Sequence, residues 1–105
     1  MTINLTIDEL DEVRRILHKA LVIGASCRSP KVWIFGSRAT GRARPFSDLD
    51  LLISLPEKLD WRVRSDLADA FEASKLPFRV DVVDAVNLSP GFAARVWAEC
   101  QQVEF

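Results

Sequence analysis

The chain has 105 residues, of which 49% are hydrophobic and 28% are charged, the balance of a soluble globular protein. At roughly 100–200 residues per domain, this length predicts one domain spanning residues 1–105. Fourteen Lys and Arg residues against fifteen Asp and Glu residues leave a net charge of −1, which argues against a protein that binds nucleic acid through bulk charge. No apolar run approaches the roughly 20 residues needed to span a membrane.

Cysteine usage and the first ten residues indicate the compartment. Cys27 and Cys100 form neither a Cys-x-x-Cys pair nor part of a metal-ligand cluster, so they suit a reducing interior better than a secreted disulfide scaffold. Acidic residues occupy the place where a signal peptide would have a basic region. We therefore expect a cytoplasmic protein in which both cysteines are small buried hydrophobic residues.

Three segments in which apolar residues recur at helical spacing predict helices. Each follows residues that cap helix starts: a Thr-x-x-Glu capping box, an Asp, and a Ser-Pro pair. The expected helices run from the capping box at Thr6–Glu9 to Gly24, from 60 to 75, and from 90 to 100.

Short β-branched and aromatic runs predict strands at 31–35, 48–55 and 79–84. Residues 36–47 are rich in Gly, Arg, Ser and Pro and predict a long turn with a brief helical start. Helices that alternate with short apolar strands predict an α/β (α+β) fold, a small mixed sheet with helices packed against it.

Asp48 and Asp50 stand two residues apart on an expected strand, so their side chains leave the same face. Two neighbouring carboxylates repel each other unless a proton or a cation lies between them, and oxygen-only ligands suit Mg²⁺. Read alone, an Asp-x-Asp pair is more often a turn cap followed by an exposed residue of an edge strand. The buried strand at Leu51–Ile53 weakens that alternative, because spare carboxylates are costly there.

A third acid, Asp81, interrupts the apolar strand Val80–Val83. If the second and third strands pair, Asp81 can point to the same face as Asp48 and Asp50. Three carboxylates on one face can hold two Mg²⁺ ions. The alternative is that Asp81 faces solvent. Asp84 leaves the opposite face near the strand end and is expected to be a turn residue.

Gly36 and Ser37 directly follow the first strand. A residue without a side chain lets phosphate approach the backbone, and the hydroxyl and turn amides can donate to phosphate oxygens. Arg38, Arg42 and Arg44 crowd the same turn, and guanidinium groups suit polyphosphate. A solvated basic loop is the alternative for each arginine.

The turn and the acid pair occur in a fixed order: Gly-Ser, then ten intervening residues, then Asp-x-Asp. This combined pattern is far more specific than either part alone. It resembles the DNA polymerase β-like nucleotidyltransferase superfamily. Within that superfamily the chain is similar to the minimal nucleotidyltransferase (MNT) domain, the antitoxin-type partner of HEPN toxins. The segments that carry the resemblance are 35–39, 47–52, 80–84 and 88–90.

The resemblance implies a polymerase β-like nucleotidyltransferase fold and a Mg²⁺-dependent transfer of AMP from ATP. The acceptor would be a hydroxyl, on a tyrosine, of a partner HEPN toxin, and the chain would be the antitoxin of a type VII-like pair. Asp48, Asp50 and Asp81 would be the catalytic and metal-binding residues, with two ions, and Asp81 would help to deprotonate the acceptor hydroxyl. The expected nucleotide-binding residues are Gly36, Ser37, Arg38, Arg42 and Ser47.

A second reading is a non-catalytic module that neutralises its partner by forming a stoichiometric complex, its acids being a relic or a structural metal site. Both readings predict a hetero-oligomer and no direct binding of membrane or nucleic acid. The chain contains no Tyr, so it cannot be its own tyrosine acceptor. Among the remaining residues, we expect a solvated His18 and core packing of Trp33, Trp61 and Trp97. For Trp61 and Trp97 the alternative is an exposed side chain on a partner surface.

Overall fold

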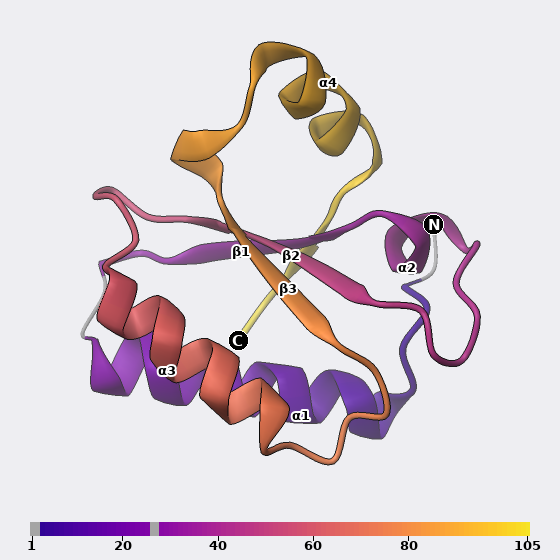
Figure 1. Ribbon diagram of the computed structural model, residues 1–105, viewed down its shortest axis with the longest axis horizontal. Helices are drawn as coiled ribbons and strands as arrows, with labels where there is room; N and C mark the ends of the chain where they lie inside the picture. Colours follow the sequence, from indigo (N-terminus) through magenta and orange to yellow (C-terminus); the bar gives the residue numbers. More distant parts are fainter. Residues whose placement is uncertain (1–2, 26–27) are drawn as a thin grey trace.

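Four strands form one mixed sheet in the order β3-β2-β1-β4 (Figure 1). β1 pairs antiparallel with β2 and with β4, whereas β2 and β3 run parallel. This computed structural model describes residues 3–25 and 28–105, so the expectation for Cys27 lies outside the described residues. The strands are β1 (Lys31–Phe35), β2 (Leu49–Ser54), β3 (Val80–Asp84) and β4 (Gln101–Val103).

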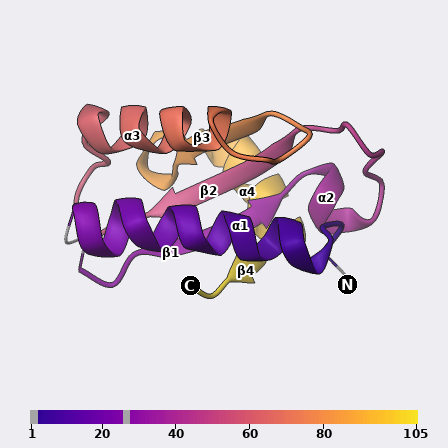
Figure 2. The same ribbon diagram turned by 90° about the horizontal axis from the view of Figure 1, so that it is seen from below.

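Helices cover both faces of the sheet. α1 and α3 run side by side across one face, and α4 lies against the other (Figures 1 and 2). α1 continues directly into a π-helical segment, η1, and a short helix, α2, follows the end of β1. The helical elements are α1 (Ile7–Leu17), η1 (His18–Gly24), α2 (Ser37–Thr40), α3 (Trp61–Glu72), the 3₁₀ turn η2 (Ala85–Asn87) and α4 (Pro90–Glu99).

The predicted helix starts are confirmed by their caps. The Thr6 hydroxyl accepts from the Glu9 N–H at 3.1 Å, and the Thr6 N–H donates to the Glu9 carboxylate at 2.9 Å, the reciprocal bonds of a capping box. Asp60 accepts from the second N–H of α3, and Ser89 accepts from the Phe92 N–H. Each bond satisfies a backbone donor that the helix itself leaves free.

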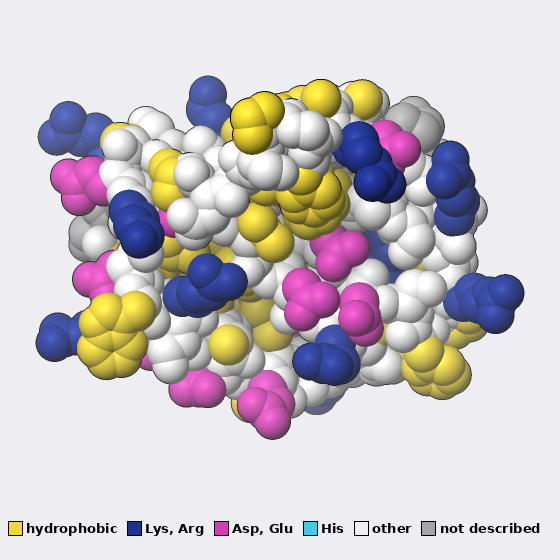
Figure 3. Space-filling view, turned by 45° about the horizontal axis from the view of Figure 1, so that its top comes forward, with side chains coloured by type: hydrophobic (Ala, Val, Ile, Leu, Met, Phe, Trp, Pro, Cys, Tyr) yellow, Lys and Arg dark blue, Asp and Glu magenta, His cyan; other side chains and the backbone are white. Residues whose placement is uncertain are grey.

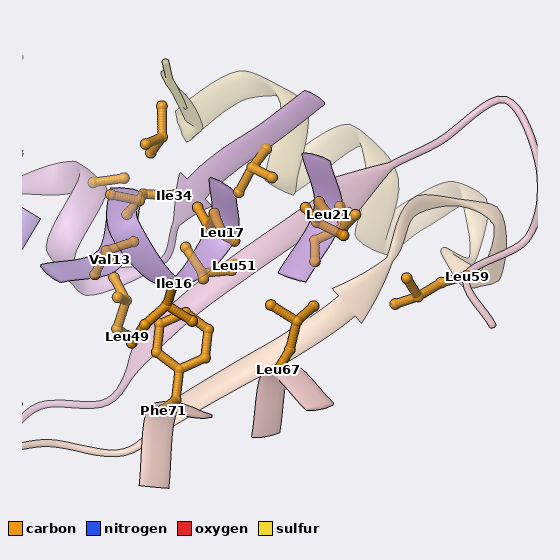
Figure 4. Close-up of a cluster of buried hydrophobic side chains, with 14 of the residues drawn as sticks. Val13, Ile16, Leu17, Leu21, Ile34, Leu49, Leu51, Leu59, Leu67 and Phe71 are labelled. Carbon is orange, nitrogen blue, oxygen red and sulfur yellow. The ribbon is translucent and has the colours of Figure 1, made fainter. Parts of the chain in front are cut away.

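The main core lies between the sheet and the α1–α3 layer (Figure 4). Leu49, Leu51 and Ile53 of β2 are fully buried on this face. Successive side chains on a strand point to opposite faces, so Asp50 and Leu52 belong to the α4 face. There a smaller apolar cluster of Phe35, Leu52 and Val96 leaves part of the sheet uncovered. The strand period thus places the acid of β2 on the thinly covered face.

The chain after α4 differs from the prediction. The third helix ends at Glu99 rather than at Cys100, and Gln101–Val103 form the edge strand β4. The expectation of a buried Cys100 is met in part: its side chain is half-buried and packs against the smaller cluster. His18 is exposed, as expected. Within residues 3–25 and 28–105, the structure contains no helix that is both long and apolar enough to cross a membrane.

The expectation of core packing is wrong for two of the three tryptophans. Trp61, the first residue of α3, is 72% exposed, and Arg62 lies over its ring at 5.5 Å. Trp97 is 46% exposed and makes a T-shaped contact with Trp33 at 4.8 Å between ring centroids. Trp33 itself is half-buried against the smaller cluster, as a strand residue on the α4 face.

Candidate active site

The pairing of β2 with β3 brings together the three acids that sequence analysis singled out. Asp50 and Asp81 are register partners in the parallel pair, so their side chains leave the same face of the sheet. Asp48 lies one residue before β2 and shares the face of Asp50. Figure 3 shows acidic side chains gathered in a hollow beside hydrophobic surface.

Asp50 is the most strongly perturbed member of this acid cluster. Its pKa is raised from the ordinary value of 3.8 to about 6, first by burial and then by the charges of Asp81 and Asp48. Burial and like charges both disfavour the ionised form of a carboxyl group. The cluster therefore has an excess of negative charge that a proton or a cation would relieve.

The donor set of the acid cluster fits a hard divalent cation. Asp48, Asp50 and Asp81 offer only carboxylate oxygens, the ligands that Mg²⁺ prefers. Asp48 and Asp81 are exposed, which leaves room for further oxygen ligands. Across residues 3–25 and 28–105, no group of three or more His, Cys, Asp or Glu side chains is already arranged to hold a metal ion.

Gly36 places the end of β1 directly against the acid cluster. Its backbone has φ 74° and ψ −151°, a conformation that residues with a side chain rarely adopt. A Cβ at this position would lie 2.6 Å from Oδ2 of Asp50. Only glycine therefore lets the Gly36–Ser37 turn approach the carboxylate so closely.

A cleft of about 690 Å³ opens beside the acid cluster. Gly36, Asp50 and Asp81 line it together with side chains from α3 and α4 that sequence analysis did not assign to the site. Helical spacing could have indicated the contribution of α4, because positions 92, 95 and 99 share one helix face. The added residues with polar or aromatic side chains are Arg64, Phe92, Arg95 and Glu99.

Arg64 is held at the edge of this cleft. Its Nη2 donates to the carbonyl of Val82 at 2.8 Å, one residue beyond Asp81 on the outer strand of the sheet. Phe92 meets Phe35 in a T-shaped contact at 6.0 Å. The cleft therefore combines acids, guanidinium groups and an aromatic wall.

The prediction that Arg38 binds nucleotide needs correction. Its side chain is only 4% exposed, and its guanidinium donates to the carbonyls of Ser47, Asn4 and Pro45. The ring of Phe78 lies 3.9 Å from the guanidinium carbon, and burial lowers the pKa of Arg38. Because its donors are engaged away from the cleft, Arg38 is not available to a phosphate.

The other predicted nucleotide-binding residues lie around the turn between β1 and β2. Ser37 is the first residue of α2, and its carbonyl accepts from the N–H of the exposed Arg42 at 3.0 Å. The Ser47 hydroxyl accepts from the Arg44 N–H at 2.8 Å, which closes the turn before Asp48. Ser47 thus has a structural contact in addition to the predicted role.

Asp84 is separate from the acid cluster, as predicted. It is 2% exposed and lies in the last position of β3, on the opposite face from Asp81. Its carboxylate accepts from the Leu59 N–H at 2.8 Å and the Val86 N–H at 3.2 Å. Asp84 is therefore a buried turn residue.

Comparison with known proteins identifies the family. The family model described as polymerase beta, nucleotidyltransferase matches residues 29–103. The chain belongs to this nucleotidyltransferase family. The matched range contains the Gly36–Ser37 turn and all three acids of the cluster. The predicted polymerase β-like fold is thereby confirmed.

Individual relatives carry more specific names. A Haemophilus influenzae protein with the name "Probable protein adenylyltransferase MntA" is 49% identical over 61 residues, which are 58% of this chain and 54% of that protein. The chain thus spans about half the length of this curated relative.

Two solved structures share the nucleotidyltransferase fold. A crystal structure of a toxin–antitoxin complex with AMP-PNP superposes with a TM-score of 0.71 at 24% identity, covering 90% of this chain and 72% of that one. A complex of tri-AMPylated Shewanella oneidensis HEPN toxin with MNT antitoxin gives a TM-score of 0.63 at 21% identity, covering 90% and 68%.

Proposed function

We propose that this chain is a Mg²⁺-dependent protein adenylyltransferase that moves AMP from ATP to a hydroxyl, on a tyrosine, of a partner HEPN toxin, and so acts as an antitoxin. The observation that carries the proposal is the acid cluster packed against Gly36 in a nucleotidyltransferase fold. The name of the Haemophilus influenzae relative and the adenylylated toxin in the Shewanella oneidensis complex support it. We further propose that residues 1–105 work as one domain in the cytoplasm.

Asp48, Asp50 and Asp81 would hold the metal. Mg²⁺, as one ion or two, would neutralise charge on the triphosphate and on the attacking oxygen. The raised pKa of Asp50 supports this assignment, because a cation would relieve the repulsion that burial and the two neighbouring charges impose.

The chain's own residues would orient the reactants and take up the proton. Gly36 and Ser37, with Arg42 and Ser47 nearby, would hold the triphosphate. The acceptor oxygen attacks the α-phosphorus, a new P–O bond forms, the bond between the α- and β-phosphates breaks, and pyrophosphate leaves. The hydroxyl proton passes to the carboxylate of Asp81. Such a reaction needs little covalent chemistry from the protein beyond positioning and charge neutralisation.

The acceptor would enter from the side of α3 and α4. The cleft is lined there by Arg64 on α3 and by Phe92 and Arg95 on α4. Because these 105 residues contain no Tyr, none of them can be a tyrosine acceptor.

The test compares wild type with a double variant that carries both Asp48→Asn and Asp50→Asn. Both changes preserve side-chain size and remove two negative charges, so the fold should survive. A matched control combines Asp66→Asn with Asp69→Asn, two exposed acids of α3. Each protein is incubated with the co-expressed partner, ATP and Mg²⁺, and the partner is then weighed by intact mass spectrometry and assayed for toxicity after separation.

We expect wild type and the α3 control to add adenylyl mass to the partner, and the site variant to lose transfer by several orders of magnitude while still binding the partner. An interface of standard size involves about 20–30 residues a side, so two substitutions should change association little. If the site variant protects cells as well as wild type and the partner never gains mass, the chain is the stoichiometric binding module instead.

A further inference from the structure

The Arg38 side chain connects two chain segments that are far apart in the sequence. Its Nη1 donates to the carbonyl of Asn4 at 2.6 Å, before α1. Its Nε donates to the Ser47 carbonyl at 3.0 Å, and its Nη2 reaches the carbonyls of Pro45 at 3.1 Å and Arg44 at 3.4 Å. Three of these four acceptors belong to residues 44–47, the loop that ends at Asp48.

A third segment meets the same guanidinium. The ring of Phe78, 9% exposed, lies 3.9 Å from the guanidinium carbon of Arg38, within the range of a cation–π contact. Phe78 is two residues before β3, the strand that carries Asp81. Arg38 itself is two residues after Gly36. Its side chain contacts both the 44–47 loop, which leads to Asp48 and Asp50, and Phe78, which precedes the strand of Asp81.

Burial of an arginine at this position costs free energy that burial of an apolar residue would not cost. The hydrogen bonds that only the guanidinium can donate offset this cost. The side chain is almost fully buried, and desolvation lowers its pKa; an apolar residue of similar length would avoid that penalty. Residues 42–48 contain no helix or strand, so their carbonyls lack the partners that regular secondary structure supplies. The fork of guanidinium donors supplies such partners from one rigid group.

We propose that Arg38 is a positioning residue of the transferase: it fixes the 44–47 loop so that Asp48 enters the acid cluster beside Asp50. The assignment rests on the proposed function for its catalytic consequence, but the ordering of the loop does not depend on that function. Arg38 touches neither nucleotide nor metal in this role and acts through backbone carbonyls and the ring of Phe78.

The test uses Arg38→Met, which keeps the length and removes every donor, and Arg38→Lys, which keeps the charge and some donors. The matched control is Phe71→Leu, at a buried core residue of α3 that takes part in none of the loop bonds. Hydrogen–deuterium exchange reports on the Arg44 and Ser47 amides, which are both hydrogen-bonded inside the loop. Adenylyl transfer to the partner gives kcat and KM separately, at a temperature where all variants are folded.

We expect Arg38→Met to speed exchange of the loop amides by roughly tenfold or more, and to lower kcat by about 100-fold, the cost of a small misplacement of a reacting group. KM for ATP should rise by less than kcat falls, because of the proposed triphosphate-binding residues only Ser47 belongs to this loop, and Arg38→Lys should restore part of the exchange and kcat effects. Phe71→Leu should lower the melting temperature without changing loop exchange or kcat.

Two results would overturn the inference. One is an amide exchange rate of the loop in Arg38→Met that equals the wild-type rate. If Arg38→Met does not fold, the same comparison is made with Arg38→Lys. The other is a kcat that falls no further than in Phe71→Leu. If wild type transfers no adenylyl group at all, the proposed function fails, while the exchange measurement still decides whether Arg38 orders the loop.

Discussion

The backbone of Gly36 and the carboxylate of Asp50 are so close that a Cβ on residue 36 would stand 2.6 Å from Oδ2 of Asp50. The two are brought together by antiparallel pairing, in which Phe35 at the end of β1 is the register partner of Asp50 on β2. Gly36 also has a positive φ of 74°, so both space and backbone conformation require glycine. The shape of the acid cluster thus depends on a residue that contributes no side chain to it.

Gly36→Ala should therefore damage the site as well as the fold. We expect the free energy of unfolding to fall by about 1–3 kcal/mol from backbone strain, and the rate of adenylyl transfer to fall by roughly 100-fold because the new methyl group displaces Asp50. Urea unfolding and intact mass of the partner measure the two effects.

Gly41→Ala is the matched control. Gly41 also has a positive φ, 79°, but the nearest atom to an added Cβ is Oδ1 of Asn4 at 3.9 Å. This variant should lose stability by roughly 1 kcal/mol and keep its transfer rate. Equal loss of transfer in both variants would mean that strain, rather than the contact with Asp50, explains the effect.

Local patterns were sufficient to predict the elements that place the acid cluster. The Thr6–Glu9 capping box marked the start of α1, and the Ser89 cap marked the start of α4. The strand period placed Asp81 on the face of Asp50 once the two strands were assumed to pair, as β2 and β3 do. These features depend on neighbours in the sequence, or on one simple pairing.

Features set by distant contacts could not be predicted in the same way. Arg38 reads as one more basic residue of a loop, because its carbonyl partners come from a loop that follows it and from Asn4 before α1. β4 is three residues long and includes two glutamines, and it becomes a strand only because β1 offers it an edge. The exposure of Trp61 depends on where α3 starts relative to the sheet, which helical spacing alone does not give.

The raised pKa of Asp50 predicts a pH-dependent stability in metal-free protein. The folded state holds this proton up to about pH 6, whereas the unfolded state releases it near pH 4. The folded state therefore binds more protons than the unfolded state between these values. The stabilising contribution of the Asp50 proton to the free energy of unfolding is fully present below about pH 4 and is lost as the pH rises through about 6.

Asp50→Asn should remove this dependence. With EDTA present at pH 7, we expect the free energy of unfolding of the variant to exceed that of wild type by roughly 1–2 kcal/mol, a figure reduced for partial solvent exposure. At pH 4 the two proteins should be nearly equal. Urea unfolding across this range gives the comparison, with the exposed Asp69→Asn as control; a constant offset at every pH would contradict the assignment.

ATP with Mg²⁺ should stabilise the protein more than ATP alone. A ligand that binds the folded state alone at about 100 times its Kd adds roughly 2.7 kcal/mol, which for a domain of this size raises the melting temperature by about 10 °C. Without Mg²⁺ the shift should shrink, because the acid cluster would then face a polyphosphate of the same charge sign. Thermal melts with ATP, with and without EDTA, measure the difference, and an equal shift in both would argue against a metal-bridged site.

Asp81 and Asp84 lie three residues apart on β3 and should respond in opposite ways to the same substitution. Asp84→Asn places an amide where a buried carboxylate now accepts from the N–H groups of Leu59 and Val86. One of these donors would lose its acceptor, so we expect the free energy of unfolding to fall by about 1–3 kcal/mol, with the transfer rate of the folded protein retained.

Asp81→Asn, in contrast, changes an exposed carboxylate that repels Asp50. Its effect on the free energy of unfolding should stay within about 0.5 kcal/mol, with a slight gain, whereas transfer of AMP should be lost because the proposed proton acceptor and metal ligand is gone. Urea unfolding and intact mass of the partner are measured for both variants. If the two faces of β3 have separate roles, Asp84→Asn loses stability but keeps transfer, and Asp81→Asn keeps stability but loses transfer. If transfer is retained in Asp81→Asn but lost in Asp84→Asn, the reaction depends on the face of Asp84 rather than on that of Asp81. That result would contradict the proposed site.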